Sequence, residues 1–271
     1  MTSRFSRSSS TNLVAIARDA PLPPTVWLVA HLDSKSQSIP MLVRIASIAV
    51  FSIAFIVLAL LVAALAIMHV AGLEANAALF DTAGVVSILA SLSLIPIALC
   101  FVGDRSNGAL DNASGVATVL LAAQQLRQSN VAILITSAEE LGLAGARAFA
   151  GNGAAGIAIN CDTIDDHGSF ICMKSGEASE KLEPAIARAS SLSGVEVRKA
   201  RSGRYLRPML PGVLADNIAL TDAGWESFTL SRGNLRTLAL VHTSSDRAET
   251  VDGTGIAEAV QLVVAIAKEL S

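Results

Sequence analysis

The chain has 271 residues, a formal net charge of −3 and a sequence pI near 5.8. This mild charge balance argues against nucleic acid as the main partner. The hydrophobic share of 52% and the mean hydropathy of +0.55 exceed what a soluble domain usually shows, and the excess lies between about Met41 and Val102. The three cysteines form no C-x-x-C pair, so neither a disulfide framework nor a thiolate zinc site is expected.

The N-terminal part predicts a short tail followed by two strands. Residues 1–11 are rich in Ser and Arg, and we expect them to be disordered. Residues 12–17 and 25–30 are apolar and are typical of strands, with prolines marking a turn between them. The second strand leads into His31 and Asp33, which are two residues apart at a strand end and can therefore point the same way.

Residues 41–102 predict an inserted transmembrane helical hairpin. The run Ile45–Met68 contains no charged residue and would form a helix about 36 Å long, enough to cross a hydrocarbon core of about 30 Å. A second uncharged run covers Thr82–Val102 and includes Pro96, which transmembrane helices tolerate. Two buried core helices or an apolar oligomer interface are the alternative interpretations.

The distribution of charge around the hairpin predicts its orientation. The connector His69–Asp81 carries two acids and no Lys or Arg. Basic residues flank the spans instead: Arg18, Lys35, Arg44 and Arg105. The positive-inside rule then places the protein in the membrane as a two-span hairpin, with the connector outside and the catalytic domain in the cytoplasm.

The remainder of the chain alternates between strand-like and helix-like segments. Strands are expected at 131–135, 156–161 and 226–231, and helices at 116–126, 144–150, 180–192, 218–224 and 255–270. This order predicts an α/β fold with a mixed, largely parallel sheet sandwiched by helices, formed by residues 12–40 and 103–271. The basic segment Arg198–Arg207 is either a solvated loop or a cationic surface that faces anionic membrane lipid.

Acids and imidazoles recur at the ends of apolar strands or in a glycine-bracketed loop. They are His31, Asp33, Asp111, Glu139, Glu140, Asp162 and His242. Two histidines and three carboxylates suit a pair of divalent ions, provided that one carboxylate bridges them. A further acid must take the proton from water, and the adjacent Glu139 and Glu140 could divide the roles of base and ligand.

Five short motifs resemble those of the M28 family of co-catalytic zinc peptidases. In chain order they are Ala30-His31-Leu32-Asp33-Ser34, Gly108-Ala109-Leu110-Asp111-Asn112-Ala113-Ser114-Gly115, Glu139-Glu140-Leu141-Gly142, Asn160-Cys161-Asp162 and His242-Thr243-Ser244-Ser245-Asp246. The match runs from about residue 12 to the C-terminus, apart from the hairpin. Each motif alone is weak, and their order and spacing carry the resemblance.

The resemblance implies a metallopeptidase with two Zn²⁺ ions, although other divalent ions are possible. Asp111 would bridge both ions, with His31 and Asp162 at one site. Glu140 and His242 would complete the other site.

The resemblance also implies a catalytic role for two further acids. Glu139 would be the general base for a water that bridges the metals, and Asp33 would orient His31. The family implies a cis peptide bond between Asp111 and Asn112.

The expected function is therefore that of a membrane-anchored aminopeptidase that acts on a peptide or aminoacyl substrate and contacts membrane lipid but no nucleic acid. A single-zinc enzyme similar to glutaminyl cyclases is one alternative, which the retained His31 and Asp33 disfavour. A catalytically inactive binding protein with a peptidase-like domain is the other. Where many M28 members have Ser-Asp-His, this chain has Ala215-Asp216-Asn217, so its specificity is open, as is its oligomeric state.

Overall fold

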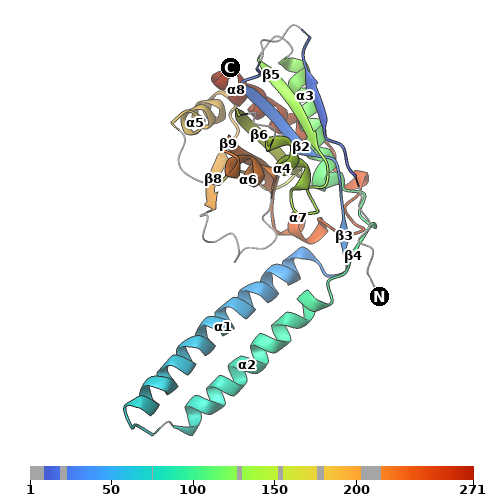
Figure 1. Cartoon of the computed structure of the whole chain (residues 1–271). Coiled ribbons are helices and arrows are strands. Elements are labelled where there is room, and N and C mark those ends of the chain that lie inside the picture. Colours follow the sequence, from blue (N-terminus) through green and yellow to red (C-terminus); the bar gives the residue numbers. More distant parts are fainter. Residues whose placement is uncertain are drawn as a thin grey trace.

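Seven strands form one central sheet, which helices cover on both faces in the computed structural model (Figure 1). The structure describes residues 9–18, 23–74, 76–126, 130–151, 155–175, 180–202 and 215–271. Most of the expected disordered tail and the part of the basic segment beyond residue 202 lie outside these ranges. The α/β prediction is confirmed.

The strand order in the sheet is β1-β5-β2-β6-β9-β7-β8. The strands are β1 (Leu13–Ile16), β2 (Val26–His31), β5 (Val131–Thr136), β6 (Ile157–Ile164), β7 (Ser169–Ser175), β8 (Val197–Ser202) and β9 (Glu226–Gly233). The pairs β2–β5, β2–β6, β6–β9 and β7–β8 are parallel, whereas β1–β5 and β7–β9 are antiparallel. The sheet is thus mixed and largely parallel.

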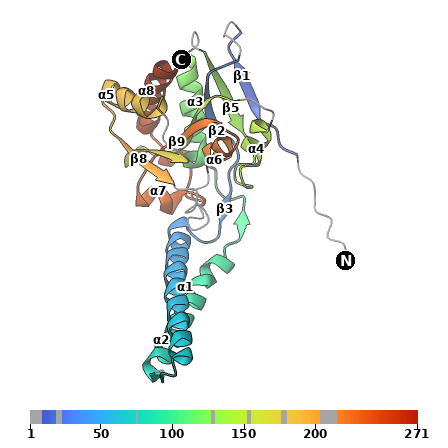
Figure 2. The same cartoon turned by 60° about the vertical axis from the view of Figure 1, so that its left-hand side comes forward.

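Six α-helices in the described ranges belong to the same domain. They are α3 (Ser114–Gln125), α4 (Ala144–Ala150), α5 (Leu182–Ser193), α6 (Asp216–Asp222), α7 (Leu235–Leu240) and α8 (Thr254–Leu270). Helix α8 contacts both α3 and α5 on one face of the sheet, and α4 and α6 pack together on the other (Figures 1 and 2).

Successive residues of β2 pack their side chains on opposite faces of the sheet. Val26 and Leu28 belong to the large apolar cluster under α3 and α8, while Trp27 and Val29 pack in the second cluster with Trp225. Side chains alternate across a strand, so a strand that is apolar at every position is buried on both faces. All six residues of β2 are buried, which explains why its sequence shows no polar alternation.

Three segments differ from the sequence expectations. Strand β7 was not predicted, because its polar ends hide the buried alternation of Phe170, Cys172 and Lys174. Strand β8 covers the start of the segment expected to be a basic loop or surface, and it pairs with β7. The run before His242 is helix α7 rather than a strand, because Asn234 caps that helix through a reciprocal capping box with Thr237.

A helical hairpin leaves this domain between β2 and α3. It consists of α1 (Met41–Val70) and α2 (Ala77–Ala98), which pack against each other and project away from the sheet (Figure 1). The short strands β3 (Ser36–Gln37) and β4 (Val102–Gly103) pair at its root. Both helices are long and apolar enough to cross a membrane, and most of their residues are exposed rather than covered by the domain.

We expect the sheet core to dominate the stability of the domain. Leu230 in β9 is fully buried in the large cluster, and Leu230→Ala should lower the free energy of unfolding by about 2–5 kcal/mol through lost burial and a residual cavity. Leu192 is 74% exposed, so Leu192→Ala is the matched control and should change stability by about 0.5 kcal/mol or less. Chemical unfolding in detergent micelles measures both, and equal effects would contradict this assignment of the core.

Candidate metal centre

His31 is the last residue of β2, and its side chain is almost fully buried. Its Nδ1 lies 3.0 Å from the backbone carbonyl oxygen of Asp33 and 3.9 Å from the nearer carboxylate oxygen of the same residue. A carbonyl can only accept, so Nδ1 carries the proton and Nε2 is left to face the centre. The orienting bond that the sequence assigned to the Asp33 side chain comes here from its backbone.

The Asp33 carboxylate instead holds the turn that carries the two glutamates. Its two oxygens accept hydrogen bonds from the backbone N–H groups of Glu139 and Glu140, each at 3.0 Å. This turn follows β5, next to β2 in the sheet. One carboxylate therefore fixes the position of the expected base and of one expected ligand relative to His31.

Asp111 lies in an irregular turn, Ala109–Ala113, that precedes α3, and the peptide bond after it is cis, as the family resemblance implied. Asp246 accepts hydrogen bonds from the backbone N–H groups of Leu110 (2.6 Å) and Asp111 (3.3 Å). Asn112 donates to the carbonyl of Cys161 at 2.9 Å and so ties the turn to β6.

The small residues of the Asp111 motif serve close packing of backbone against backbone. A Cβ at Gly115 would come within 2.4 Å of the Cys161 carbonyl oxygen, so only glycine fits there. At Gly115 this space is occupied by the backbone of β6.

The five expected metal ligands converge as two clusters that share one carboxylate. His31, Asp111 and Asp162 form the first cluster, and Asp111, Glu140 and His242 form the second, with the ligand atoms of each within 4.8 Å of one another. His31 Nε2 lies 3.1 Å from Asp111 Oδ1, while His242 Nε2 lies 2.9 Å from Asp111 Oδ2. The two oxygens of Asp111 therefore face different histidines.

The remaining two ligands complete the clusters on opposite sides of Asp111. Asp162 Oδ1 is 3.8 Å from His31 Nε2, and Glu140 Oε1 is 2.9 Å from His242 Nε2. Asp162 was expected at the end of its strand, but β6 continues past it through an irregularity between Cys161 and Ile164. This irregularity, with Thr163 at φ 58°, lets the Asp162 side chain reach the centre from within the strand.

Charges in this centre perturb one another strongly. Burial alone would lower the pKa of His242, but Asp111 and Glu140 raise it to about 9. The same opposition, with Asp111 and Asp162 as partners, holds the pKa of His31 well above its usual value. Burial would raise the pKa of Asp111, yet the two imidazoles keep it far below its usual range.

Glu139 is buried beside the centre without belonging to either cluster. Burial is the main cause that raises the pKa of Glu139 to about 10, with the charges of Asp162, Asp216 and Glu140 acting in the same direction and His31 against it. Nearby cations favour the ionised form of a carboxyl group, so bound divalent ions would lower this pKa.

The residues fit a pair of divalent cations. Two imidazoles and three carboxylates match the donor types that zinc accepts. Glu140 Oε1 and His242 Nε2 are buried and lie 2.9 Å apart, yet within the described ranges neither atom has a hydrogen bond of suitable geometry. Buried polar atoms without a partner are costly, and a cation between them would remove that cost.

Several residues at the centre escaped the sequence analysis. The Lys35 ammonium contacts Glu140 Oε2, and Gln37 lies 3.2 Å from His242 Nδ1 through its side-chain oxygen. Asp246 was identified from the sequence only as the last residue of the His242 motif, and no role was predicted for it. Asp216 is fully buried, and burial raises its pKa to about 6. The available signal for Asp216 was its place in Ala215-Asp216-Asn217, where many family members have Ser-Asp-His.

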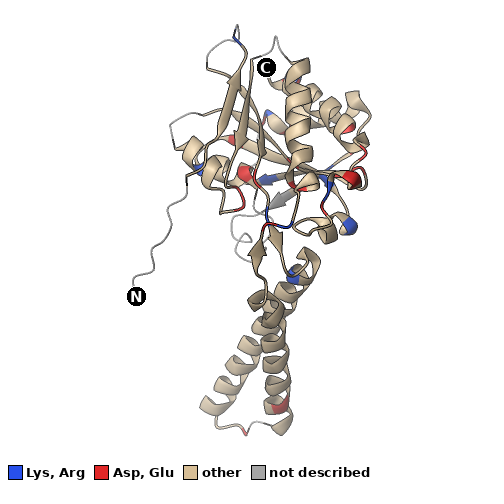
Figure 3. Cartoon of the chain, turned by 90° about the vertical axis from the view of Figure 1, so that its right-hand side faces the viewer, with Lys and Arg blue, Asp and Glu red and all other residues tan. Residues whose placement is uncertain are grey.

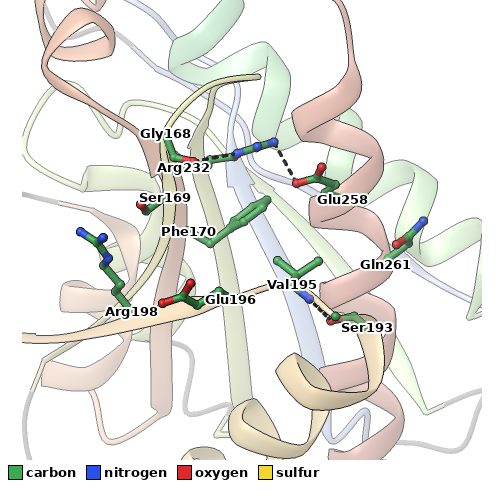
Figure 4. A pocket seen from close by; sticks show the side chains of 11 residues that line it. Gly168, Ser169, Phe170, Ser193, Val195, Glu196, Arg198, Arg232, Glu258 and Gln261 are labelled. Carbon is green, nitrogen blue, oxygen red and sulfur yellow. Dashed lines mark hydrogen bonds and ion pairs between the residues drawn. The ribbon is translucent and has the colours of Figure 1, made fainter.

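A separate cavity of about 410 Å³ lies between β7, α5 and α8 (Figure 4). None of the candidate ligands lines it. Its Arg232 donates to the Gly168 carbonyl, pairs with Glu258 at 3.1 Å and lies over the ring of Phe170. Because the Arg232 guanidinium already has partners, it is not a free group for binding a ligand in this cavity. The two metal clusters therefore remain the candidate functional site.

Comparison with solved structures supports the same fold. An aminopeptidase from Legionella pneumophila, LapA, aligns with 20% identity and a TM-score of 0.50 over 61% of this chain and 47% of its own. An aminopeptidase from Aneurinibacillus sp. strain AM-1 gives the same identity and TM-score over 61% of this chain and 40% of its own. The chain thus aligns with less than half of the length of these two proteins. No curated protein sequence matches it.

The sequence model for peptidase family M28 matches residues 77–267, more than two thirds of the chain. This range contains Asp111, Glu139, Glu140, Asp162 and His242, whereas His31 precedes it. The chain therefore belongs to peptidase family M28.

Proposed function

We propose that this chain is a membrane-anchored dinuclear zinc aminopeptidase. The observation that carries the proposal is the sharing of Asp111 between two three-residue clusters, each containing one histidine and one further carboxylate. Membership of a peptidase family supports a peptide substrate. Both similar structures described above are aminopeptidases, which favours removal of N-terminal residues over other hydrolytic reactions.

The protein's own residues would divide the work as follows. Asp111 would bridge two zinc ions, with His31 and Asp162 on one side and Glu140 and His242 on the other. Bound zinc supplies the Lewis acidity that lowers the pKa of water from about 16 to about 7. That change corresponds to roughly 12 kcal/mol at 1.36 kcal/mol per unit, more than one side chain supplies.

Glu139 is the proposed general base. Its neighbour Glu140 belongs to a cluster, and the Asp33 carboxylate fixes both backbone N–H groups, so the Glu139 side chain is held beside the clusters. It would take a proton from the attacking water and deliver it to the leaving amine. The burial of Glu139 limits competing contact with bulk water.

Two alternative functions fit the arrangement less well. A single-zinc enzyme needs one cluster, yet all three residues of both clusters are present and the histidine of each cluster faces the same aspartate. A non-catalytic binding protein has no need of a buried acid beside the ligands, and Glu139 is present. The dinuclear hydrolase accounts for all six residues.

The proposed membrane anchor is the hairpin α1–α2, inserted between domain segments 12–40 and 103–271. No charged residue lies in Ile45–Met68 or Thr82–Val102, and Arg44 lies in the first turn of α1. Figure 3 shows acidic residues toward the distal end of the hairpin and a basic residue near the domain. This asymmetry supports a cytoplasmic catalytic domain under the positive-inside rule. The hairpin root contacts the His242 loop, so the site would open near the bilayer and favour peptides or aminoacyl compounds held there.

The metal content of detergent-purified protein is the first measurement that tests this proposal. We expect about two zinc ions per chain by elemental mass spectrometry, because each cluster offers three ligands. About one ion would favour the single-zinc alternative. No bound metal after reconstitution with zinc would contradict the dinuclear enzyme.

Glu139→Gln tests the base. The amide cannot accept the proton, so we expect turnover to fall by about 10²–10⁴-fold while two zinc ions remain bound. Asp111→Ala is the contrasting variant and should lose metal as well as activity, because it removes the shared ligand. Cleavage of aminoacyl reporter substrates and metal content are measured on the same samples. Full activity in Glu139→Gln would remove the assignment.

Cysteine labelling tests the orientation. Leu73 in the connector and Leu192 in α5 are both exposed, and each is replaced by cysteine in a Cys100→Ser background because Cys161 and Cys172 are buried. A membrane-impermeant maleimide should label Leu73→Cys in intact cells and Leu192→Cys only after lysis. The opposite pattern would place the catalytic domain outside.

A further inference from the structure

The root of the hairpin touches the second metal cluster directly. Gln37, in β3, donates its backbone N–H to the carbonyl of His242 at 2.8 Å, and its side-chain oxygen lies 3.2 Å from His242 Nδ1. The same side-chain oxygen is contacted by the guanidinium of Arg44, in the first turn of α1. One residue thus links the first membrane helix to a candidate metal ligand.

The chemistry of these three groups determines where the proton on His242 lies. A guanidinium has only donors, so the Gln37 atom that Arg44 contacts is the amide oxygen. An amide oxygen only accepts, so His242 Nδ1 must be the donor of the second bond. Nε2, which faces Asp111 and Glu140 at 2.9 Å, is then the nitrogen available to a metal ion.

Packing reinforces this link. Met41, the first residue of α1, is buried in a small apolar cluster with Leu110 and Val241. These two residues immediately precede Asp111 and His242. The start of the membrane helix therefore supports the backbone on both sides of the second cluster, and helix α1 also contacts α7.

We infer that Gln37, held by Arg44, is a positioning residue for metal binding at His242, so that the hairpin root is part of the metal centre. This inference rests on the proposed dinuclear function and adds a role that belongs to the inserted segment. Partners that hold the outer nitrogen of a metal-bound histidine fix its tautomer and raise its basicity, and their loss typically costs about 10–100-fold in metal affinity.

The test compares zinc affinities of full-length variants in detergent. Gln37→Leu removes the acceptor, and we expect one of the two zinc ions to bind about 10–100-fold more weakly. Gln37→Glu keeps an acceptor at the same place and should bind both ions with affinities close to those of the unaltered protein. Arg44→Leu leaves His242 and Gln37 intact but frees the Gln37 side chain, so it should weaken the same ion.

Ser38→Ala is the matched control. Ser38 donates to the Leu99 carbonyl and accepts from the Phe101 N–H at the same root, both at 2.8 Å. Its loss should loosen the root without changing either zinc affinity. Competition with a chromophoric chelator gives the affinities, and the visible absorption of the cobalt-substituted protein reports on the ligand geometry independently of activity.

The outcomes separate this inference from the proposed function. The proposed function and the inference are both supported if the unaltered protein binds two ions tightly, Gln37→Leu weakens one of them, and Gln37→Glu restores its affinity. Unchanged affinities in Gln37→Leu and Arg44→Leu, or an equal loss in Ser38→Ala, overturn the positioning role and leave the dinuclear centre standing. Absence of tight binding in the unaltered protein overturns the proposed function, and the inference with it. If Gln37→Leu does not fold, Arg44→Leu decides the matter.

Discussion

The structure depends on one carboxylate that meets two imidazoles in a buried place. Asp111 presents one oxygen to His31 and the other to His242, and further carboxylates flank each histidine. Three acids within such a space repel one another, and burial adds a desolvation cost that two protonated imidazoles only partly offset. The divalent cations proposed here would remove both costs. The proposed need for them therefore follows from electrostatics before any reaction is considered.

Holding this charged cluster requires a scaffold of hydrogen bonds from residues that are not ligands. Asp246 fixes the N–H groups before and at Asp111, Asp33 fixes those of the glutamate pair, and Asn112 joins the aspartate turn to β6. Positive φ angles at Ala138, Thr163 and His242 place non-glycine residues in the left-handed region beside or at the centre. Such conformations cost about 1–3 kcal/mol each and persist where surrounding contacts over-determine them.

The fold class and the convergence of the ligands followed from patterns that are local in the chain. Apolar β-branched runs marked β2 and β5, and parallel neighbours bring their carboxyl ends together, so His31 and the glutamate pair were expected to meet. The elements and hydrogen bonds that were not predicted depend on contacts between residues that are distant in the chain. Strand β7 is defined by pairing with β8 and β9, and helix α7 by a capping box that competes with a strand-like apolar run. Asp33 is a further example of a distant contact that local patterns do not predict. Its spacing in the sequence predicted that it lies near His31, but its carboxylate accepts hydrogen bonds from backbone N–H groups about a hundred residues away in the chain.

The place of the hairpin in the chain links the proposed membrane anchor physically to the candidate site. The polypeptide leaves β2 just after His31, runs through α1 and α2, and returns at β4 just before the Asp111 turn, so the insertion joins two ligand-bearing segments. Both ends of an insertion must lie near the residues that it connects, and the pairing of β3 with β4 keeps them together. A tilt of α1 against the domain would act first on Met41, Arg44 and Gln37, whose contacts end at Leu110 and His242. Insertion at this point places the root of the proposed membrane anchor against His242, one of the candidate ligands.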